Sequence, residues 1–230
     1  MIHGIRLKIC GLTSLVDAAL ADQSGADYLG FVLYAESPRR VTLAQFGAMV
    51  ARLPARRKVA VMVEPAPADL TAAVQAGFDF CQVHFRMEKA TAVAGWVEAV
   101  GAERLWLAPK LPAAADLPVT LLPLVGTFLL DAFAADRFGG TGRNADWPKF
   151  RRHREAHPEK TWILAGGLNP ENIGEALAAT GARCIDVNSG VEVSPGVKDA
   201  AKLQSLVERL RAAKQSDCSG SMQWETTNGH

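Results

Sequence analysis

The sequence lacks the usual marks of a metalloprotein or a nucleic-acid-binding protein. Its four cysteines, at positions 10, 81, 184 and 218, match neither a zinc-ligand spacing nor a CxxC redox pair. Twenty-five basic residues balance 24 acidic ones, for a formal net charge of +1, and no basic stripe or acidic tract stands out. We therefore expect no metal site and no nucleic-acid partner.

Long hydrophobic runs are also missing, and we expect no secretory leader. No stretch reaches the ~18 consecutive apolar residues of a membrane span. The opening MIHGIRLKIC does not follow a charged segment with a long apolar one, as signal peptides do. We expect no membrane association, a cytoplasmic location and cysteines that remain reduced thiols.

What the sequence does contain is a repeating unit marked by glycines at positions 25, 77, 101 and 181. Each follows a helical pattern, where glycine readily takes the left-handed conformation that closes a helix. Each precedes a short apolar run typical of a strand buried on both faces. The intervals are near multiples of about 26 residues, which suits one strand, one helix and two turns.

The pattern predicts eight strands with helices between them. Strands are expected at residues 5–10, 27–33, 58–63, 79–84, 104–108, 127–132, 161–165 and 183–188. Helices are expected at 14–24, 42–52, 66–76, 87–100, 146–155, 170–180 and 199–213, with a short proline-broken helix at 112–116. Thr42 with Gln45 and Ser14 with Asp17 have capping-box spacing, and Asn169 is a candidate helix cap.

Strands that alternate with helices imply a parallel sheet, and eight such units favour an α/β fold of the (β/α)₈ TIM-barrel type. An open doubly wound sheet is the alternative, although IRLKICGL lacks a full GxGxxG. We expect one domain over residues 1–213. The small and polar residues 214–230 are expected to form a disordered tail.

In such a barrel the reactive side chains stand at the carboxyl ends of the strands. Cys10, His84 and Asp131 each end a predicted strand. Each also has a structural reading: a core cysteine, a hydrogen-bonded histidine and an aspartate that caps a turn. Cys81 and Cys184 fall inside strands and are expected to be core residues. The shared placement of the first three favours chemistry on that rim.

Two glycine loops follow the last two predicted strands, AGGLNPENI and NSGVE. In barrels this pair of loops commonly holds a phosphate, because glycine lets backbone N–H groups approach the phosphate oxygens. The residues expected to bind it are Gly166, Gly167, Ser189 and Gly190. Two tight turns would explain the glycines of either loop alone.

Two further segments are expected to lie at the same rim. The glycine-rich FGGTGRNADW, residues 138–147, follows strand six and suits a loop that closes over a ligand, or else a plain linker. In ESPRRV, after strand two, Arg39 or Arg40 is either a surface charge or a partner for a substrate carboxylate.

Five segments together resemble the phosphoribosylanthranilate isomerase family of tryptophan biosynthesis. They are KICGLT, GADYLGFVLYAESPRRV, LLDAFAADRFGGTGRNADW, ILAGGLNPENI and DVNSGVEVSPGVKD, in that order from strand one to strand eight. The resemblance implies a TIM-barrel isomerase that rearranges N-(5-phosphoribosyl)anthranilate by an Amadori reaction. It also implies no metal and no organic cofactor. We expect a monomer or a homodimer that binds a small phosphoribosyl substrate.

The resemblance implies a role for each matching residue. Cys10 matches the general base and Asp131 the general acid, while Arg39 matches the residue that holds the anthranilate carboxylate. The glycine loops match the phosphate site named above. The remaining expected substrate contacts are His84, Asp186, Gly139, Gly140 and Thr141.

These roles set protonation requirements. Asp131 must be protonated when it acts, so its surroundings must raise its pKa above about 3.9. A free thiol has a pKa near ~8.5, so Cys10 needs nearby positive charge to act as a thiolate. We expect that charge from the start of the helix near Ser14 and from the cationic iminium of the substrate.

The sequence departs from the family pattern at three places. Phe85 replaces the glycine of the usual QLHG, which we expect to narrow the rim or reshape the next loop. Asn188 replaces a serine, with little expected effect, and Lys110 does not clearly match the family's strand-five lysine. Alternatives are a metal-dependent phosphosugar epimerase, a ketol isomerase with paired aspartates, and a barrel that binds a phosphorylated ligand without catalysis.

Overall fold

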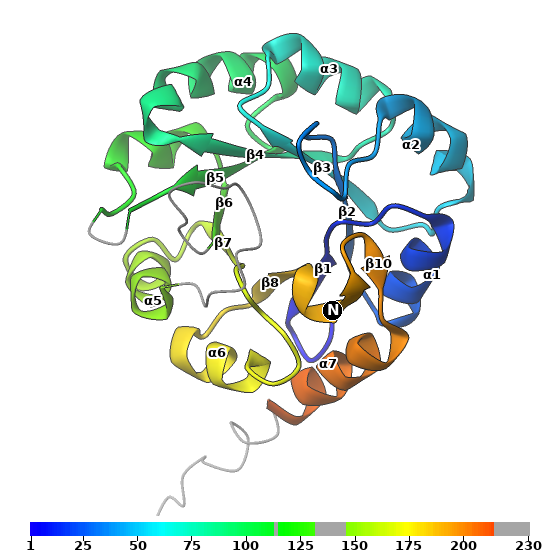
Figure 1. Ribbon diagram of the computed structural model, residues 1–230. Coiled ribbons are helices and arrows are strands. Elements are labelled where there is room, and N and C mark those ends of the chain that lie inside the picture. Colours follow the sequence, from blue (N-terminus) through cyan, green and yellow to red (C-terminus); the bar gives the residue numbers. More distant parts are fainter. Residues whose placement is uncertain (113–114, 132–145, 214–230) are drawn as a thin grey trace, which may run out of the picture.

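The computed structural model of the chain describes residues 1–112, 115–131 and 146–213, and these form a closed parallel barrel wrapped by helices (Figure 1). The strands are β1 (Arg6–Ile9), β2 (Tyr28–Val32), β3 (Arg57–Val63), β4 (Phe80–Arg86), β5 (Leu105–Lys110), β6 (Thr127–Leu130), β7 (Thr161–Leu164) and β8 (Cys184–Val187). β1 closes the barrel by pairing with β8. The predicted TIM barrel is confirmed, and the open sheet is excluded.

Helices cover the outside of the barrel. They are α1 (Leu15–Gln23), α2 (Leu43–Met49), α3 (Pro67–Gln75), α4 (Val93–Val100), α5 (Trp147–Ala156), α6 (Ile173–Thr180) and α7 (Ala200–Ala213). The capping box of Thr42 and Gln45 is confirmed at α2. At α1, the Ser14 hydroxyl accepts from the amide of Asp17, but the Asp17 carboxylate bonds hydroxyls and a distant amide instead of completing the box.

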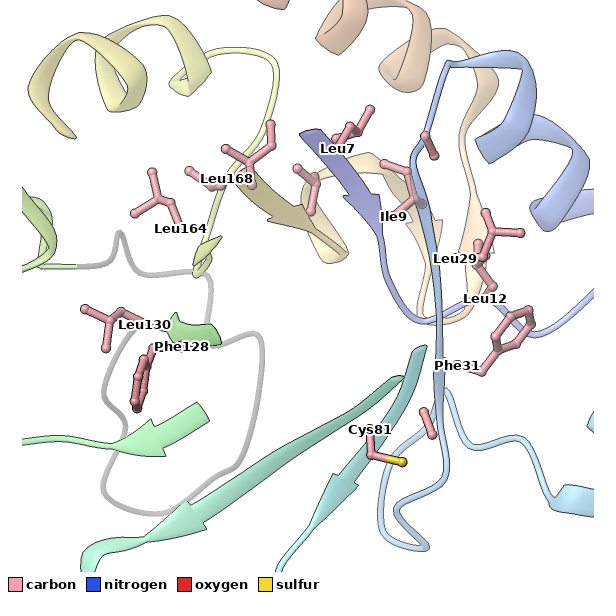
Figure 2. Close-up of a cluster of buried hydrophobic side chains, with 14 of the residues drawn as sticks. Leu7, Ile9, Leu12, Leu29, Phe31, Cys81, Phe128, Leu130, Leu164 and Leu168 are labelled. Atoms are coloured by element: carbon pink, nitrogen blue, oxygen red, sulfur yellow. The ribbon is translucent and has the colours of Figure 1, made fainter. Parts of the chain in front are cut away.

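The two faces of each strand differ in character. Outward side chains pack against the helices in one continuous apolar cluster, of which Figure 2 shows a part, including Leu7 and Ile9 of β1 and Phe31 of β2. Because side chains alternate along a strand, the residues between them point into the barrel. A second cluster there includes Trp106, Ile163 and Cys184.

Several predicted boundaries were wrong. β4 runs on through Phe85 and Arg86, beyond its expected end at residue 84. Two expected helices begin or end with 3₁₀ turns, Val50–Arg52 after α2 and Met87–Ala92 before α4. The short helix expected near residue 112 is not seen in the described part, and a 3₁₀ segment at Val119–Leu124 precedes β6.

The helix expected to begin at residue 170 begins at Ile173. The Asn169 side chain accepts from the amides of Glu171 and Asn172, at 3.0 and 2.9 Å, and folds this segment into a turn. Asn172 is therefore the residue that precedes the helix, without a side-chain capping bond. The prediction that Asn169 caps α6 was wrong.

A short hairpin, β9 (Glu192–Ser194) and β10 (Val197–Lys198), follows the last barrel strand. It lies beside α1, because the backbone amide of Lys198 donates to Asp17 at 2.8 Å. Among the described helices, none is long and apolar enough to cross a membrane. The expected tail at residues 214–230 lies outside the described residues.

Candidate active site

Cys10 follows β1 directly and lies on the inward side of the strand, in line with Lys8. Its side chain is 4% exposed and packs with Val32 and Val61 at the carboxyl end of the barrel. The outward cysteine Cys81 belongs to the other, apolar cluster against the helices. Cys81 and Cys184 are buried core residues, as predicted.

A buried ion pair lies beside Cys10. The Lys8 ammonium donates to the Asp186 carboxylate at 2.7 Å, and the Lys8 side chain has no exposed surface. Gly30 of the neighbouring strand leaves room for it, since a Cβ there would lie 3.0 Å from Nζ. Asp186 Oδ1 is buried and has no protein partner among the described residues. A substrate hydroxyl that reached this oxygen would satisfy it.

The surroundings of Cys10 favour the neutral thiol. Burial raises the pKa of the Cys10 thiol, and the Asp186 carboxylate raises it further, while Lys8 and Lys198 act in the opposite direction. For Lys8, burial alone would lower the pKa, but the attraction of Asp186 raises it above its ordinary value. Burial therefore acts against the start of α1 and the cationic iminium of the substrate, which we expect to favour the thiolate.

His84 also points into the barrel, next to Gln82. Gln82 Nε2 and His84 Nε2 lie 2.8 Å apart, and Gln82 Oε1 is buried without a partner in the described chain. Burial, with the charges of Lys8 and Lys110, lowers the pKa of His84 to about 3. A neutral histidine offers a hydrogen bond but no positive charge at this position.

Asp131 follows β6 directly, at the same end of the barrel as Cys10. The position of β6 is set by its pairing with β7, where Leu130 lies opposite Leu164. The other residues predicted after this strand, Gly139, Gly140 and Thr141, lie outside the described residues.

The two glycine loops meet, as a shared phosphate site requires. A Cβ on Gly190 would lie 2.8 Å from Asn169 Cβ and closer still to the carbonyl oxygen of Leu168, so only glycine fits there. The Ser189 and Gly190 amides begin a 3₁₀ turn (Ser189–Val191), where backbone N–H groups have no acceptor within the turn. On the other loop, Asn172 Nδ2 donates to the Gly167 carbonyl at 2.9 Å.

Arg39 is held by a protein carboxylate. Its Nε donates to both oxygens of Glu192, at 2.9 and 3.1 Å, and its Nη2 donates to Oε2 at 2.7 Å. The two side chains are 15% and 4% exposed. A Cβ on Gly11, whose φ is +73°, would collide with both Arg39 and Asn188, so glycine there lets them pass close to the backbone.

The three departures from the family pattern have structural consequences. Phe85 is fully buried on the outward face, where it packs edge-to-face on Trp96 at 5.4 Å. The expectation that it narrows the rim was wrong, because its ring lies in the apolar layer under the helices. Lys110 is the last residue of β5, and its positive charge contributes to the lowered pKa of His84. The Asn188 side chain accepts a hydrogen bond from Lys198 Nζ at 3.1 Å.

Sequence reasoning missed four polar residues of this region, Lys8, Gln82, Glu192 and Lys198. A usable signal existed for the first two, since each shares strand parity with a predicted site residue, Cys10 or His84. A lysine inside an otherwise apolar strand is a buried charge and needs a partner.

Within the described residues, no three His, Cys, Asp or Glu side chains gather as a metal site would need.

Comparison with known proteins agrees with this geometry. Residues 7–209 match the family model described as N-(5'phosphoribosyl)anthranilate (PRA) isomerase. A relative from Zymomonas mobilis, named N-(5'-phosphoribosyl)anthranilate isomerase, is 35% identical over 211 residues, which cover 90% of this chain and 98% of that protein.

Solved structures of the same family superpose on the barrel. A monomeric form of the dimeric enzyme from Thermotoga maritima has a TM-score of 0.73 at 29% identity, covering 90% of this chain and 98% of that one. A complex with reduced 1-(o-carboxyphenylamino)-1-deoxyribulose 5-phosphate has a TM-score of 0.72 at 28% identity, covering 90% and 99%. The chain therefore belongs to the N-(5'-phosphoribosyl)anthranilate isomerase family.

Proposed function

We propose that this chain converts N-(5-phosphoribosyl)anthranilate to 1-(2-carboxyphenylamino)-1-deoxyribulose 5-phosphate by an Amadori rearrangement. One observation carries the proposal. Cys10 faces the barrel interior beside the Lys8–Asp186 pair, on the rim where the two glycine loops touch. When those loops hold the phosphate of a phosphosugar, its sugar carbons lie over the mouth of the barrel, near the Cys10 thiol.

In the first step Asp131 donates its proton to the ribose ring oxygen as the bond from C1′ to that oxygen breaks. The lone pair of the anilino nitrogen forms a C=N bond with C1′, which gives a cationic iminium. In the second step the Cys10 thiolate removes the proton from C2′. The electron pair of that C–H bond forms the C1′–C2′ double bond, and the π pair of the C=N bond returns to nitrogen as its lone pair, which neutralises the iminium. The resulting enol then gives the ketone. General acid–base help of this kind contributes about 10²–10⁴-fold for each group.

The raised pKa of Cys10 is compatible with this reaction. A thiolate with a protonated Asp131 carries as many protons as a thiol with an ionised Asp131. The reactive form is therefore a constant fraction of the enzyme over the pH range between the two pKa values. The iminium formed in the first step adds a positive charge next to C2′, where it favours the thiolate when it is needed.

The two ends of the substrate bind at separate places on the rim. The amides of Ser189 and Gly190, with the loop of Gly166 and Gly167, hold the phosphate, and the neutral His84 donates or accepts at a sugar hydroxyl. Asp186 Oδ1, which has no partner in the described protein, accepts from another hydroxyl. Arg39 binds the anthranilate carboxylate.

The activity is tested with the purified unmodified chain. Anthranilate and ribose 5-phosphate condense to give the fluorescent substrate, whose decay the enzyme should accelerate far beyond the spontaneous rate. The gene should also rescue growth of a tryptophan auxotroph that lacks this step. Absence of both acceleration and rescue would overturn the proposal.

A further inference from the structure

The Arg39–Glu192 contact uses only one edge of the guanidinium. An arginine has five N–H donors, one on Nε and two on each Nη. Glu192 takes the donor on Nε and one on Nη2. The two hydrogens on Nη1 and the second hydrogen on Nη2 form the end-on edge. Among the described residues no acceptor takes these three hydrogens, so this edge can fork a second carboxylate.

Glu192 is itself fixed from several directions. Lys198 Nζ donates to Glu192 Oε1 at 2.9 Å, and the backbone amide of Gly196 donates to the same oxygen at 3.2 Å. Lys202 Nζ holds the Glu192 carbonyl at 2.7 Å. Burial alone would raise the pKa of Glu192, but the bonds from Arg39 and Lys198 lower it, so the group is a carboxylate at neutral pH.

The same short segment also carries the phosphate loop. Ser189 and Gly190 stand at the start of the turn that leads directly into Glu192, the first residue of β9. The β9–β10 hairpin lies next to β1 and α1 in the fold (Figure 1), and the Asp17 carboxylate anchors it through the Lys198 amide. One anchored segment therefore determines where both the phosphate site and Arg39 lie.

We propose that Glu192 is a positioning residue that presents the end-on edge of Arg39 to the carboxylate on the aromatic ring of the substrate. The proposal rests on the proposed function, since it assigns that carboxylate to Arg39. Arg39 has a flexible side chain, and the fork with Glu192 removes most of its rotamer freedom before the substrate arrives. Glu192 thereby selects for an aromatic amine with an ortho carboxylate without touching it.

The test compares three ligands by calorimetry on the whole chain. They are the reduced product 1-(o-carboxyphenylamino)-1-deoxyribulose 5-phosphate, the same molecule without its ring carboxylate, and ribose 5-phosphate. In Glu192→Gln the carboxylated ligand should bind about 10-fold more weakly, while the Kd values of the other two change less than about twofold. In turnover, KM should rise more than kcat falls.

Two outcomes of the ligand comparison overturn the proposal. An equal loss of affinity for all three ligands would mean that Glu192 only maintains the loop, and unchanged affinity for the carboxylated ligand would mean that it positions nothing. Failure of the proposed function is a different result, because the unmodified chain would then show no turnover and no preference for the carboxylated ligand.

Three further variants keep the test decisive. Glu155→Gln removes a carboxylate from an exposed pair with Arg151 and should change no affinity. If Glu192→Gln does not fold because Lys198 is left buried and unpaired, Glu192→Gln with Lys198→Met removes both charges and should show the same selective loss. The double variant Arg39→Ala with Glu192→Gln should bind the carboxylated ligand about as weakly as Arg39→Ala alone. If the affinity losses of the two single variants simply add, the proposal is contradicted.

Discussion

The two faces of β1 make the clearest contrast in the molecule. Outward, Leu7 and Ile9 are fully buried among other apolar side chains under the helices. Inward, Lys8 is just as buried but is a charge, and Cys10 lies beside it. Burial thus has different consequences for neighbouring residues along the chain. Burial of the outward apolar side chains stabilises the fold, whereas burial of the inward ionisable side chains shifts their pKa values.

The contrast teaches that burial alone does not identify a core residue in a barrel. Burying an unpaired charge costs roughly several kcal/mol of folding free energy. A buried lysine such as Lys8 therefore needs a partner of opposite charge, here Asp186. We therefore expect stability and catalysis to respond to different substitutions on the two faces.

The largest effect is expected at the inward rim. Asp131→Asn should lower kcat by about 10²–10⁴-fold, because the amide cannot protonate the ring oxygen, while the melting temperature stays close to that of the unmodified chain. Substrate fluorescence decay measures the rate. The control Asp116→Asn alters an exposed carboxylate, 66% accessible, and should leave kcat unchanged. An Asp131→Asn enzyme with more than a tenth of the normal rate would refute the acid role.

The outward face should show the opposite response. Phe31 is fully buried and meets Phe46 and Phe78 edge-on, so Phe31→Ala should cost about 3–5 kcal/mol of unfolding free energy. Urea unfolding gives this number, and kcat per folded molecule should remain normal. A large fall in kcat at full folding would show that the two faces are not separable.

The buried ion pair tests the inward face for stability. Lys8→Met leaves the Asp186 carboxylate buried and unpaired, which should cost about 3–5 kcal/mol. Adding Asp186→Asn should restore much of that loss but not the activity. If the double variant is no more stable than Lys8→Met in urea, the cost has another origin than an uncompensated charge.

The sequence alone predicts the outward face of the barrel better than the inward face. The outward face repeats with glycines and apolar runs, and this local pattern was enough to predict the barrel. Predicted boundaries were wrong at the end of β4, which runs on through Phe85 to Arg86, and at the start of α6, where the Asn169 side chain folds the segment into a turn.

The inward face was predicted only in part. Candidate residues at strand ends, such as Cys10 and Asp131, can be chosen once the fold is predicted, because the active sites of such barrels lie at the carboxyl ends of the strands. The partners of buried charges were not found, since Lys8 meets Asp186 across 178 residues of chain and Arg39 meets Glu192 across 153. No local spacing reports such a contact.

A smaller effect concerns pH. Burial and nearby positive charges lower the pKa of His84 to about 3, whereas an unfolded histidine titrates near ~6.5. The unfolded chain therefore binds the extra proton first, and stability falls as the pH drops from about 6.5 towards 3. His84→Gln should lose less stability than the unmodified chain between pH 7 and pH 5, as measured by urea unfolding. An equal loss in both would show that His84 is not shielded from protonation.

The most direct test uses two buried cysteines on opposite faces. Cys10→Ala should lower kcat by at least about 100-fold with little change in unfolding free energy. Cys81→Ala, the same substitution in the outward layer, should cost about 1 kcal/mol and leave kcat unchanged. If Cys10→Ala turns over at a near-normal rate, Cys10 is not the base and the inward face does not carry the chemistry assigned to it.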